Sequence, residues 1–261
     1  MGTARSGDRG RLARLDWLAG PLLILAVQQV LFGVPVGVVL NGAVLGLITA
    51  LVALGMFLVY RANRVLNFAQ GELGLIPGVL AVLLITESGL PWLLALAIGL
   101  IASFLLGSAS EFLVIRRFFR APRLVLTVAT LGLAQTLGFL ALWMPRWWDA
   151  RVASQRTDVP LDLVWDVGPI RLSADHLLVL VAAPLVLALV GLLLHRTDLG
   201  IAIRASAERP DRASSLGVPV KAVQTLVWGI AGTLAFLALF LRAGVMGLPV
   251  RGALGFGLLL R

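Results

Sequence analysis

Cysteine is absent from the 261 residues, and charged residues and histidines are scarce. The lack of cysteine excludes disulfide bonds, thiol catalysis and cysteine-ligated metals. The only histidines, His176 and His195, lie at opposite ends of one long apolar run, so no metal site is expected. Charged residues make up 13% of the chain, whereas soluble domains carry about 25%. So little polar surface cannot face water on every side, and lipid is predicted to be the main solvent.

Long uncharged runs are abundant: 59% of the residues are hydrophobic and the mean hydropathy is +0.98. A membrane-spanning helix needs about 20 apolar residues. The uncharged stretch Trp17–Tyr60 is long enough for two spans with a turn at Phe32–Gly37. The further predicted spans are Asn67–Thr86, Leu90–Ile115, Leu124–Met144, Ala174–Leu194 and Ala222–Leu241, and another begins near Gly252. The predicted fold is therefore an all-α polytopic transmembrane bundle of about seven or eight spans.

The basic residues predict the orientation of these spans. With a cytoplasmic N-terminus, 15 of the 22 Lys and Arg residues fall in cytoplasmic segments and six fall on the opposite side. This is the positive-inside bias of membrane proteins. The net charge of +9 is therefore attributed to topology, and no nucleic-acid partner is expected. Residues 1–15 are predicted to be a basic cytoplasmic segment, and residues 16–261 the transmembrane domain.

Two connecting segments are long enough to have structure of their own. In the outer one, Leu161–Val167 and Ile170–Leu172 are predicted to pair as a small hairpin. In the inner one, Pro210 and Gly217 bracket a short helix near 210–216, since proline suits a first helical turn and glycine the position after the last. A helix outside the membrane, in a chain without a catalytic domain, predicts that a partner docks on it.

Asn67–Glu72 is a polar segment within an apolar region. It allows two interpretations. Asn67 lies only three residues after Arg64, which favours a helix that starts at the membrane surface with Asn67 as its cap. If the helix is instead broken and re-entrant, its N–H groups and Glu72 lie at membrane depth, where polar groups usually line a cavity. Glu111 is predicted to pair with Arg116 or Arg117, and Gly42 and Gly46 form a motif that suits close helix packing.

Three blocks of the chain, in order, resemble a known family. The first comprises Asn41-Gly-Ala-Val-Leu-Gly46 and Val65-Leu-Asn-Phe-Ala-Gln-Gly-Glu72, and the second, weaker one is Glu111, Arg116 and Leu124–Gly132. The third is in the inner loop and matches at Gly200, Arg204, Ala205, Ala207, Glu208, Ala213, Leu216 and Gly217. These blocks resemble the branched-chain amino acid ABC transporter permeases of the LivH/LivM type. The family has a histidine where this chain has Gln70, and it continues past residue 261 with further helices, so its C-terminal part is expected to be missing here.

The resemblance implies a permease subunit in a bacterial inner membrane that imports branched-chain or related amino acids or amides. It implies a second permease subunit, cytoplasmic ABC ATPase subunits and an extracytoplasmic substrate-binding protein as partners. ATP hydrolysis then belongs to a partner chain, which agrees with the absence of a phosphate-binding loop motif; no catalytic residue, cofactor or metal is expected. The implied ATPase-coupling residues are Arg204, Ala207, Glu208, Pro210, Ala213, Leu216 and Gly217. The candidates for the translocation pathway are Asn41, Asn67, Gln70, Gly71 and Glu72.

Three other classes remain open from the residues. An ion-coupled secondary transporter needs broken helices and acids near the membrane midplane, for which only Glu72 is a candidate. An intramembrane enzyme needs clustered Asp, Glu or His, which the arginine-rich inner loops do not offer. The residues alone do not exclude a purely structural membrane subunit. The predicted inner-loop helix with its matching pattern is the feature that separates an ABC permease from all three classes.

Overall fold

The structure is a computed structural model that describes residues 33–118, 121–148, 156–157, 159–161, 163–167, 169–208 and 210–248, with a few positions between 20 and 31. Its long helices are α2 (Val36–Asn63), α3 (Gln70–Thr86), α4 (Trp92–Leu113), α5 (Arg123–Trp143), α6 (Ala174–Arg196) and α9 (Val220–Met246). The shorter elements are η1 (Ile115–Phe118), η2 (Met144–Trp148), β1 (Val164–Val167), β2 (Ile170–Ser173), α7 (Asp198–Glu208) and α8 (Pro210–Ser215).

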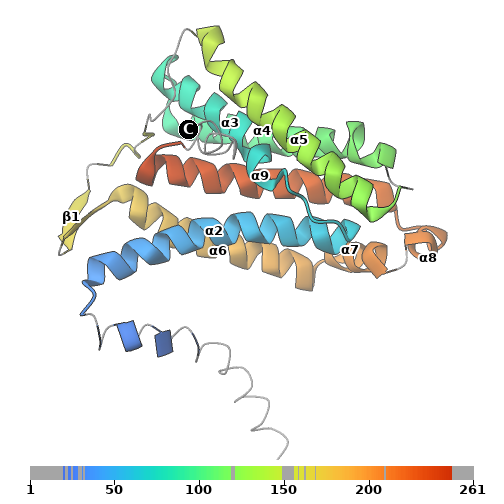
Figure 1. Ribbon diagram of the computed structural model, residues 1–261, viewed down its shortest axis with the longest axis horizontal. Coiled ribbons are helices and arrows are strands. Elements are labelled where there is room, and N and C mark those ends of the chain that lie inside the picture. The colour runs from blue at the N-terminus through green and yellow to red at the C-terminus, as the bar shows by residue number, and fades with distance from the viewer. Residues whose placement is uncertain are drawn as a thin grey trace, which may run out of the picture.

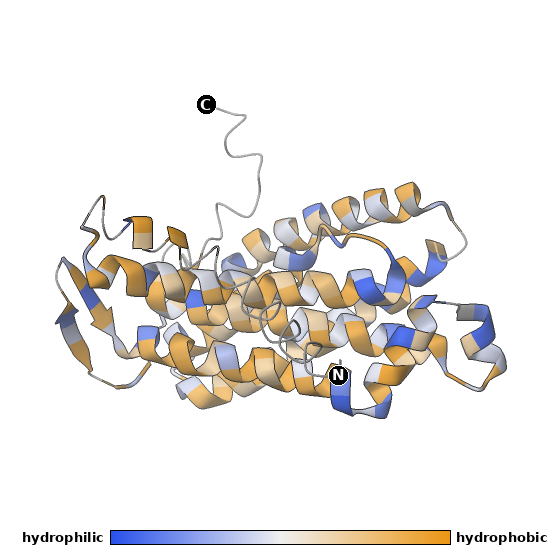
Figure 2. Cartoon of the chain, turned by 90° about the horizontal axis from the view of Figure 1, so that it is seen from below, coloured by the Kyte–Doolittle hydropathy of each residue, from blue (hydrophilic) through white to orange (hydrophobic). Residues whose placement is uncertain are grey.

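The chain folds into a bundle of roughly parallel and antiparallel helices (Figure 1). α9 runs between a layer formed by α2 and α6 and a layer formed by α3, α4 and α5. α7 and α8 lie at one end of the bundle, hereafter the α8 end. The β1–β2 hairpin lies at the other, hereafter the hairpin end. Hydrophobic residues cover the length of the helices, and most hydrophilic residues gather at the two ends (Figure 2).

Prolines set the start of four of these helices. Pro35, Pro91, Pro122 and Pro219 immediately precede α2, α4, α5 and α9. Proline has no N–H to donate, so it suits the start of a helix, where no preceding turn offers a carbonyl group to bond. The predicted break before residue 37 is therefore confirmed, with α2 beginning at Val36.

Five helices in the described part of the chain are long and apolar enough to cross a membrane: α2, α4 with η1, α5 with η2, α6 and α9. On α6 the leucine and valine side chains at 181, 185, 189 and 192 are exposed along the membrane-spanning length, which is a favourable arrangement only against lipid. The protein is thus an all-α, multi-pass membrane protein. The predicted spans at either end of the chain lie almost wholly outside the described residues, as does the segment 1–15, so seven or eight spans stays a prediction.

The most extensive helix contact in the described part of the chain joins α4 to α9. Small residues recur every fourth position on α4, at Gly99, Ser103 and Gly107, and all three are buried. A Cβ atom at Gly107 would collide with the carbonyl oxygen of Trp228, and one at Gly232 would lie 2.6 Å from that of Ser103. Such a stripe lets two backbones approach, as transmembrane packing favours.

Gly42 and Gly46 of α2, unlike the glycines of α4, lie in open space. A Cβ atom at either would meet no described atom within 4 Å. This motif on α2 therefore packs against nothing in the described part of the protomer.

The hairpin is confirmed in place and pairing. β1 and β2 are antiparallel, with Val164 opposite Ser173 and Val167 opposite Ile170. Ser173 then caps α6: its side chain and backbone form a capping box with His176. The hairpin therefore leads directly into a membrane-spanning helix.

Candidate functional site

The chain between α2 and α3 turns back into the bundle. α2 ends where Arg64 takes a left-handed conformation (φ 56°), and residues 64–69 then run back beside the helices to the start of α3 (Figure 1). The Phe68 N–H donates to Thr130 Oγ1 of α5 at 3.3 Å. Gln70 Nε2 donates to the carbonyl oxygen of Ala231 at 2.9 Å, near the middle of the 27-residue helix α9. At 1.5 Å per residue, α3 begins roughly 16 Å inside the α8 end of α9.

This path decides between the two interpretations of the polar segment. Asn67 does not cap α3: the N-cap residue is Ala69, and Asn67 Oδ1 accepts a 3.0 Å hydrogen bond from the Ala69 N–H in the turn before the helix. The position at the membrane surface, which the spacing from Arg64 favoured, is wrong. Residues 64–69 form a bend, a short irregular stretch and a turn that is bonded to α5. They carry the chain from the end of α2 back to the level of Gly55, which lies eight residues before Asn63 on that helix.

The amide side chains of this segment are fully enclosed. Asn67 and Gln70 are 0% and 1% exposed, and Asn67 Nδ2 donates to Gln70 Oε1 at 3.3 Å. Across from them, a Cβ atom at Gly55 of α2 would collide with the Gln70 amide. Gln70 thus fills a contact between α2, α3 and α9, and its amide faces the protein interior.

Gly71 and Glu72 lie on the more open side of the same turn. Both are half-buried, and a Cβ atom at Gly71 would meet nothing within 4 Å. Glu72 forms no ion pair with any residue that the structure describes. A carboxylate in the first turn of a helix is stabilised by the helix dipole. Gly71 and Glu72 are therefore open toward the outside of the protomer at the level of the middle of α9, whereas Asn67 and Gln70 are enclosed.

Asn41 lies apart from this turn. It is 14 residues before Gly55 on α2, which places it about 21 Å away along the helix. It lines a polar cavity of about 630 Å³ at the hairpin end, together with Arg156, Asp175 and His176. The predicted pathway residues therefore occupy two separate places.

Buried Asp175 organises the hairpin-end cavity. Its Oδ1 accepts from the Val159 N–H at 3.1 Å, and its Oδ2 from Ser173 Oγ at 3.2 Å. The His176 Nδ1 accepts from the Ser173 N–H at 3.1 Å. Asp175 was not among the predicted site residues; its place in the first helical turn after a capping serine was the available sequence signal.

The inner loop contains two helices. α8 occupies 210–215, so the predicted short helix is confirmed to within one residue. Its end is closed by a Schellman-type turn, in which the Val218 N–H donates to the Ala213 carbonyl and Gly217 takes φ 84°. The preceding helix, α7, was not predicted. It is fixed to α6 by Arg204, whose Nη1 donates to the carbonyl oxygen of Leu194 at 2.6 Å.

The predicted coupling residues lie together on α7, α8 and the turn that follows, at the α8 end. Ala213 is buried and Ala207 half-buried, whereas Glu208 is exposed. Leu216 is 85% exposed, the largest exposure among the large apolar side chains described. An apolar side chain at the tip of a protruding loop gains from burial by a partner.

Most of the chain matches a known protein family. The family "Branched-chain amino acid transport system / permease component" matches residues 38–247. The chain belongs to this permease family.

Two curated relatives agree with it. The permease is 27% identical over 206 residues to the "Probable branched-chain amino acid transport permease protein LivH" of Methanocaldococcus jannaschii, an alignment that covers 77% of this chain and 64% of that protein. It is 26% identical over 209 residues to the "High-affinity branched-chain amino acid transport system permease protein BraD" of Pseudomonas aeruginosa, with 76% and 67% covered. The chain thus spans about two thirds of the length of these relatives. No solved structure matches it.

Family membership and the apolar helices together make the permease a multi-pass inner-membrane protein.

A network of polar side chains joins two of its helices near α8. Glu111 is 1% exposed and pairs with Arg116 at 2.9 Å, which confirms the predicted ion pair. Thr225 Oγ1, on α9, donates to Glu111 Oε2 at 2.6 Å. The end of α4 is thereby bonded to the first turns of α9, which follow directly after α8.

Beside this network lies a polar cavity of about 390 Å³ beneath α7 and α8. Asn63 Oδ1 and Ser206 Oγ are buried at its wall and bond to no described atom. A cavity of this size, with polar groups to satisfy, is suited to hold water. The permease therefore has a loosely packed region between α8 and the membrane-spanning helices.

Proposed function

We propose that this chain is the membrane-spanning permease subunit of an ATP-driven ABC importer, and that it forms the translocation pathway for branched-chain or related amino acids or amides. Its relatives are named as branched-chain amino acid transport permeases. ATP is hydrolysed by separate cytoplasmic ABC ATPase subunits. A second permease subunit and an extracytoplasmic binding protein complete the transporter.

The observation that carries this proposal is α8 with its exposed Leu216. α8 projects beyond the ends of the membrane-spanning helices (Figure 1). It is the coupling helix on which the ATPase docks, and the α8 end is cytoplasmic, together with the N-terminus. Glu208, Pro210 and Gly217 belong to the same docking surface. When the ATPase moves α8, the short turn 216–219 and the bonds of Thr225 pass that motion to α9 and α4.

The pathway passes the first turn of α3. Gly71 and Glu72 are the groups at mid-depth that remain open, and ionisable groups there usually line a water-filled route. Asn67 and Gln70 contribute indirectly by holding this turn against α9 and α2. Asn41 belongs to the outer entrance.

An ion-coupled secondary transporter is the second candidate. It is favoured by one observation: α3 is a short helix of 17 residues that starts beside the middle of α9 and carries the acid Glu72 in its first turn. Ion-coupled transporters use helix ends at such a depth to bind ions. The two functions differ in what drives uptake, an ATPase or an ion gradient.

The deciding experiment is co-purification of the full-length permease with its candidate ATPase from detergent extracts. Leu216→Asp should lose the ATPase while the permease still inserts, since it places a charge in the centre of an apolar contact. Leu161→Asp, the same change at an exposed leucine of the hairpin end, is the matched control and should retain it. Glu208 and Gly217 variants should uncouple ATP hydrolysis from transport. If no ATPase binds the unaltered permease, the importer proposal fails and uptake should then follow an ion gradient.

A further inference from the structure

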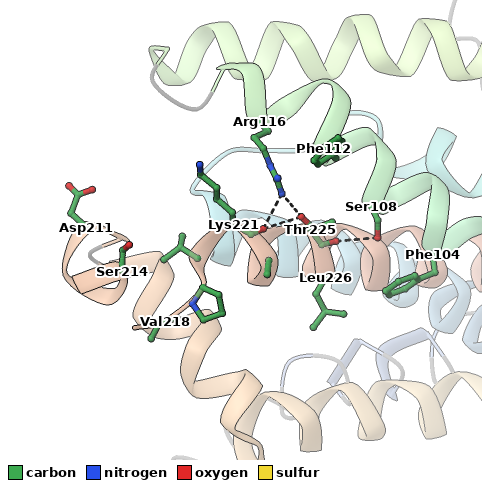
Figure 3. A pocket seen from close by; sticks show the side chains of 13 residues that line it. Phe104, Ser108, Phe112, Arg116, Asp211, Ser214, Val218, Lys221, Thr225 and Leu226 are labelled. Carbon is green, nitrogen blue, oxygen red and sulfur yellow. Dashed lines mark hydrogen bonds between the residues drawn. The ribbon is translucent and has the colours of Figure 1, made fainter. Parts of the chain in front are cut away.

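A groove at the α8 end joins apolar and basic side chains. It has a volume of about 870 Å³ and lies between α4, η1, α8 and α9. Phe104, Phe112 and Leu226 line the part of it along the membrane-spanning helices. Arg116 and Lys221 lie at its α8 end, with Asp211 on the α8 wall (Figure 3). The apolar part follows the bilayer core, and the basic part is at the level where the helices end.

The basic groups retain free donors. Lys221 is exposed, and its Nζ makes no ion pair or hydrogen bond with the residues described. Arg116 bonds Glu111 through Nε and Nη2 and lies over the Phe112 ring at 4.8 Å, but its Nη1 has no bond to a described residue. Glu111 is buried behind Arg116 and is not part of the groove lining. The lining therefore carries two positive charges against the one negative charge of Asp211.

We propose that this groove binds an anionic phospholipid, with one acyl chain along Phe104 and Leu226 and the phosphate at Arg116 and Lys221. Basic pockets between transmembrane helices at the cytoplasmic surface are suited to anionic headgroups. The apolar wall explains why the ligand is a lipid and not a soluble anion. The phosphate end of the ligand lies beside the first turn of α9, so an occupied groove also fixes the position of α9 relative to α4.

Lys221 is the only lysine of the chain, which permits a direct test. The full chain is placed in nanodiscs of phosphatidylcholine, with or without phosphatidylglycerol, and treated with an amine-acetylating reagent. Mass spectrometry of the peptide that contains Lys221 gives the labelling rate. If the groove is occupied about nine-tenths of the time, the rate falls about tenfold with phosphatidylglycerol.

An internal control comes from Arg117→Lys. Arg117 is exposed on η1, next to Arg116, but does not line the groove. Its variant carries a second lysine at the same membrane surface, so a general effect of surface charge slows both lysines equally. The proposal requires that Lys221 is slowed several-fold more than the new lysine. Equal slowing of the two, or no slowing of either, overturns it.

Leu226→Trp tests the acyl-chain part of the groove. Leu226 is half-buried, and the larger ring fills the groove without removing a charge. The protection of Lys221 by phosphatidylglycerol should then be lost. Protection that persists in this variant overturns the groove as the site. If Lys221 reacts freely in both lipids and is shielded only when the ATPase is added, the occupant is the partner protein and the lipid proposal is wrong.

Discussion

Glu111 is a carboxylate that folding has removed from water almost completely. Its charge is balanced by Arg116 and by a hydrogen bond from Thr225. Removing one partner of a buried pair leaves the other charge uncompensated, so Glu111→Ala is expected to cost about 3 kcal/mol. Glu111→Gln keeps the volume and some hydrogen bonds and should cost about 1 kcal/mol. Both costs are changes in the free energy of unfolding, which denaturation of the detergent-solubilised protein measures.

Glu208→Gln is the control for that comparison. Glu208 is exposed at the end of α7, so the change should alter stability by less than about 0.5 kcal/mol. If Glu111→Ala unfolds no more easily than Glu208→Gln, the Glu111 network contributes nothing to stability.

Gly55 and Gln70 occupy one shared space between α2 and α3. A methyl group at Gly55 would collide with the Gln70 amide, so Gly55→Ala alone is expected to displace this amide from its hydrogen bond to Ala231 and to destabilise the protein. Gln70→Ala removes the obstacle, and the double variant should be more stable than the sum of the two changes predicts. A coupling of about 1 kcal/mol or more is expected for side chains in such contact.

The Gly55 and Gln70 variants form a double-mutant cycle, and Gly71→Ala provides its reference, since the space around Gly71 is open. Combined with Gln70→Ala it should show additive effects. Additivity in the Gly55 cycle as well would mean that the two side chains do not meet in the folded permease.

Among the elements, α8 depends on a single glycine to end. Gly217 has φ 84°, a conformation that costs an alanine about 1 kcal/mol. Gly217→Ala should therefore weaken the turn in which the Val218 N–H bonds to the Ala213 carbonyl. Hydrogen exchange should become faster in residues 210–218, while the membrane-spanning helices stay protected. Unchanged exchange in this segment would contradict the assigned cap; Gly42→Ala, at an open position on α2, is the control.

Some of these elements could be predicted from the sequence and others could not. Uncharged apolar runs predicted the long helices, and the Pro210–Gly217 bracket predicted α8, because these signals are local. The sequence left the depth of Asn67 open between two interpretations and favoured the surface, since the depth depends on Thr130 and Ala231, which lie far away in sequence. α7 was missed because it is only 11 residues long and is held by a tertiary bond from Arg204.

Over the whole molecule, the two ends differ in structure and in what they can bind. The α8 end combines α8 with its exposed Leu216, a polar cavity and a basic groove, and the hairpin end has a polar cavity over buried Asp175. At the α8 end, the network of Glu111, Arg116 and Thr225 bonds α4 and η1 to α9. α9 is also the helix that contacts α2, α3 and α4. If α8 is the coupling helix proposed above, its movement is expected to reach the turn at Gly71 through α9, to which Gln70 is bonded.

The absence of cysteine makes this arrangement directly testable by single-cysteine labelling. With the proposed orientation, a membrane-impermeant maleimide added to intact cells should label Trp165→Cys in the hairpin. Ser215→Cys at the end of α8 should react only after the membrane is permeabilised. The reverse pattern would invert the topology and place α8 out of reach of a cytoplasmic ATPase.

Gly71→Cys extends the test to the middle of the membrane. Only a hydrated thiol ionises and reacts readily, so a cysteine that faces a water-filled pathway is distinguished from one that faces lipid. Leu185→Cys is the matched control, because Leu185 is 57% exposed near the middle of α6 but on its lipid-facing side. With a small thiol reagent, Gly71→Cys should react at least about tenfold faster, as thiolate formation requires. Equally slow reaction at both positions would show that water does not reach the first turn of α3, and the pathway would then have to run elsewhere.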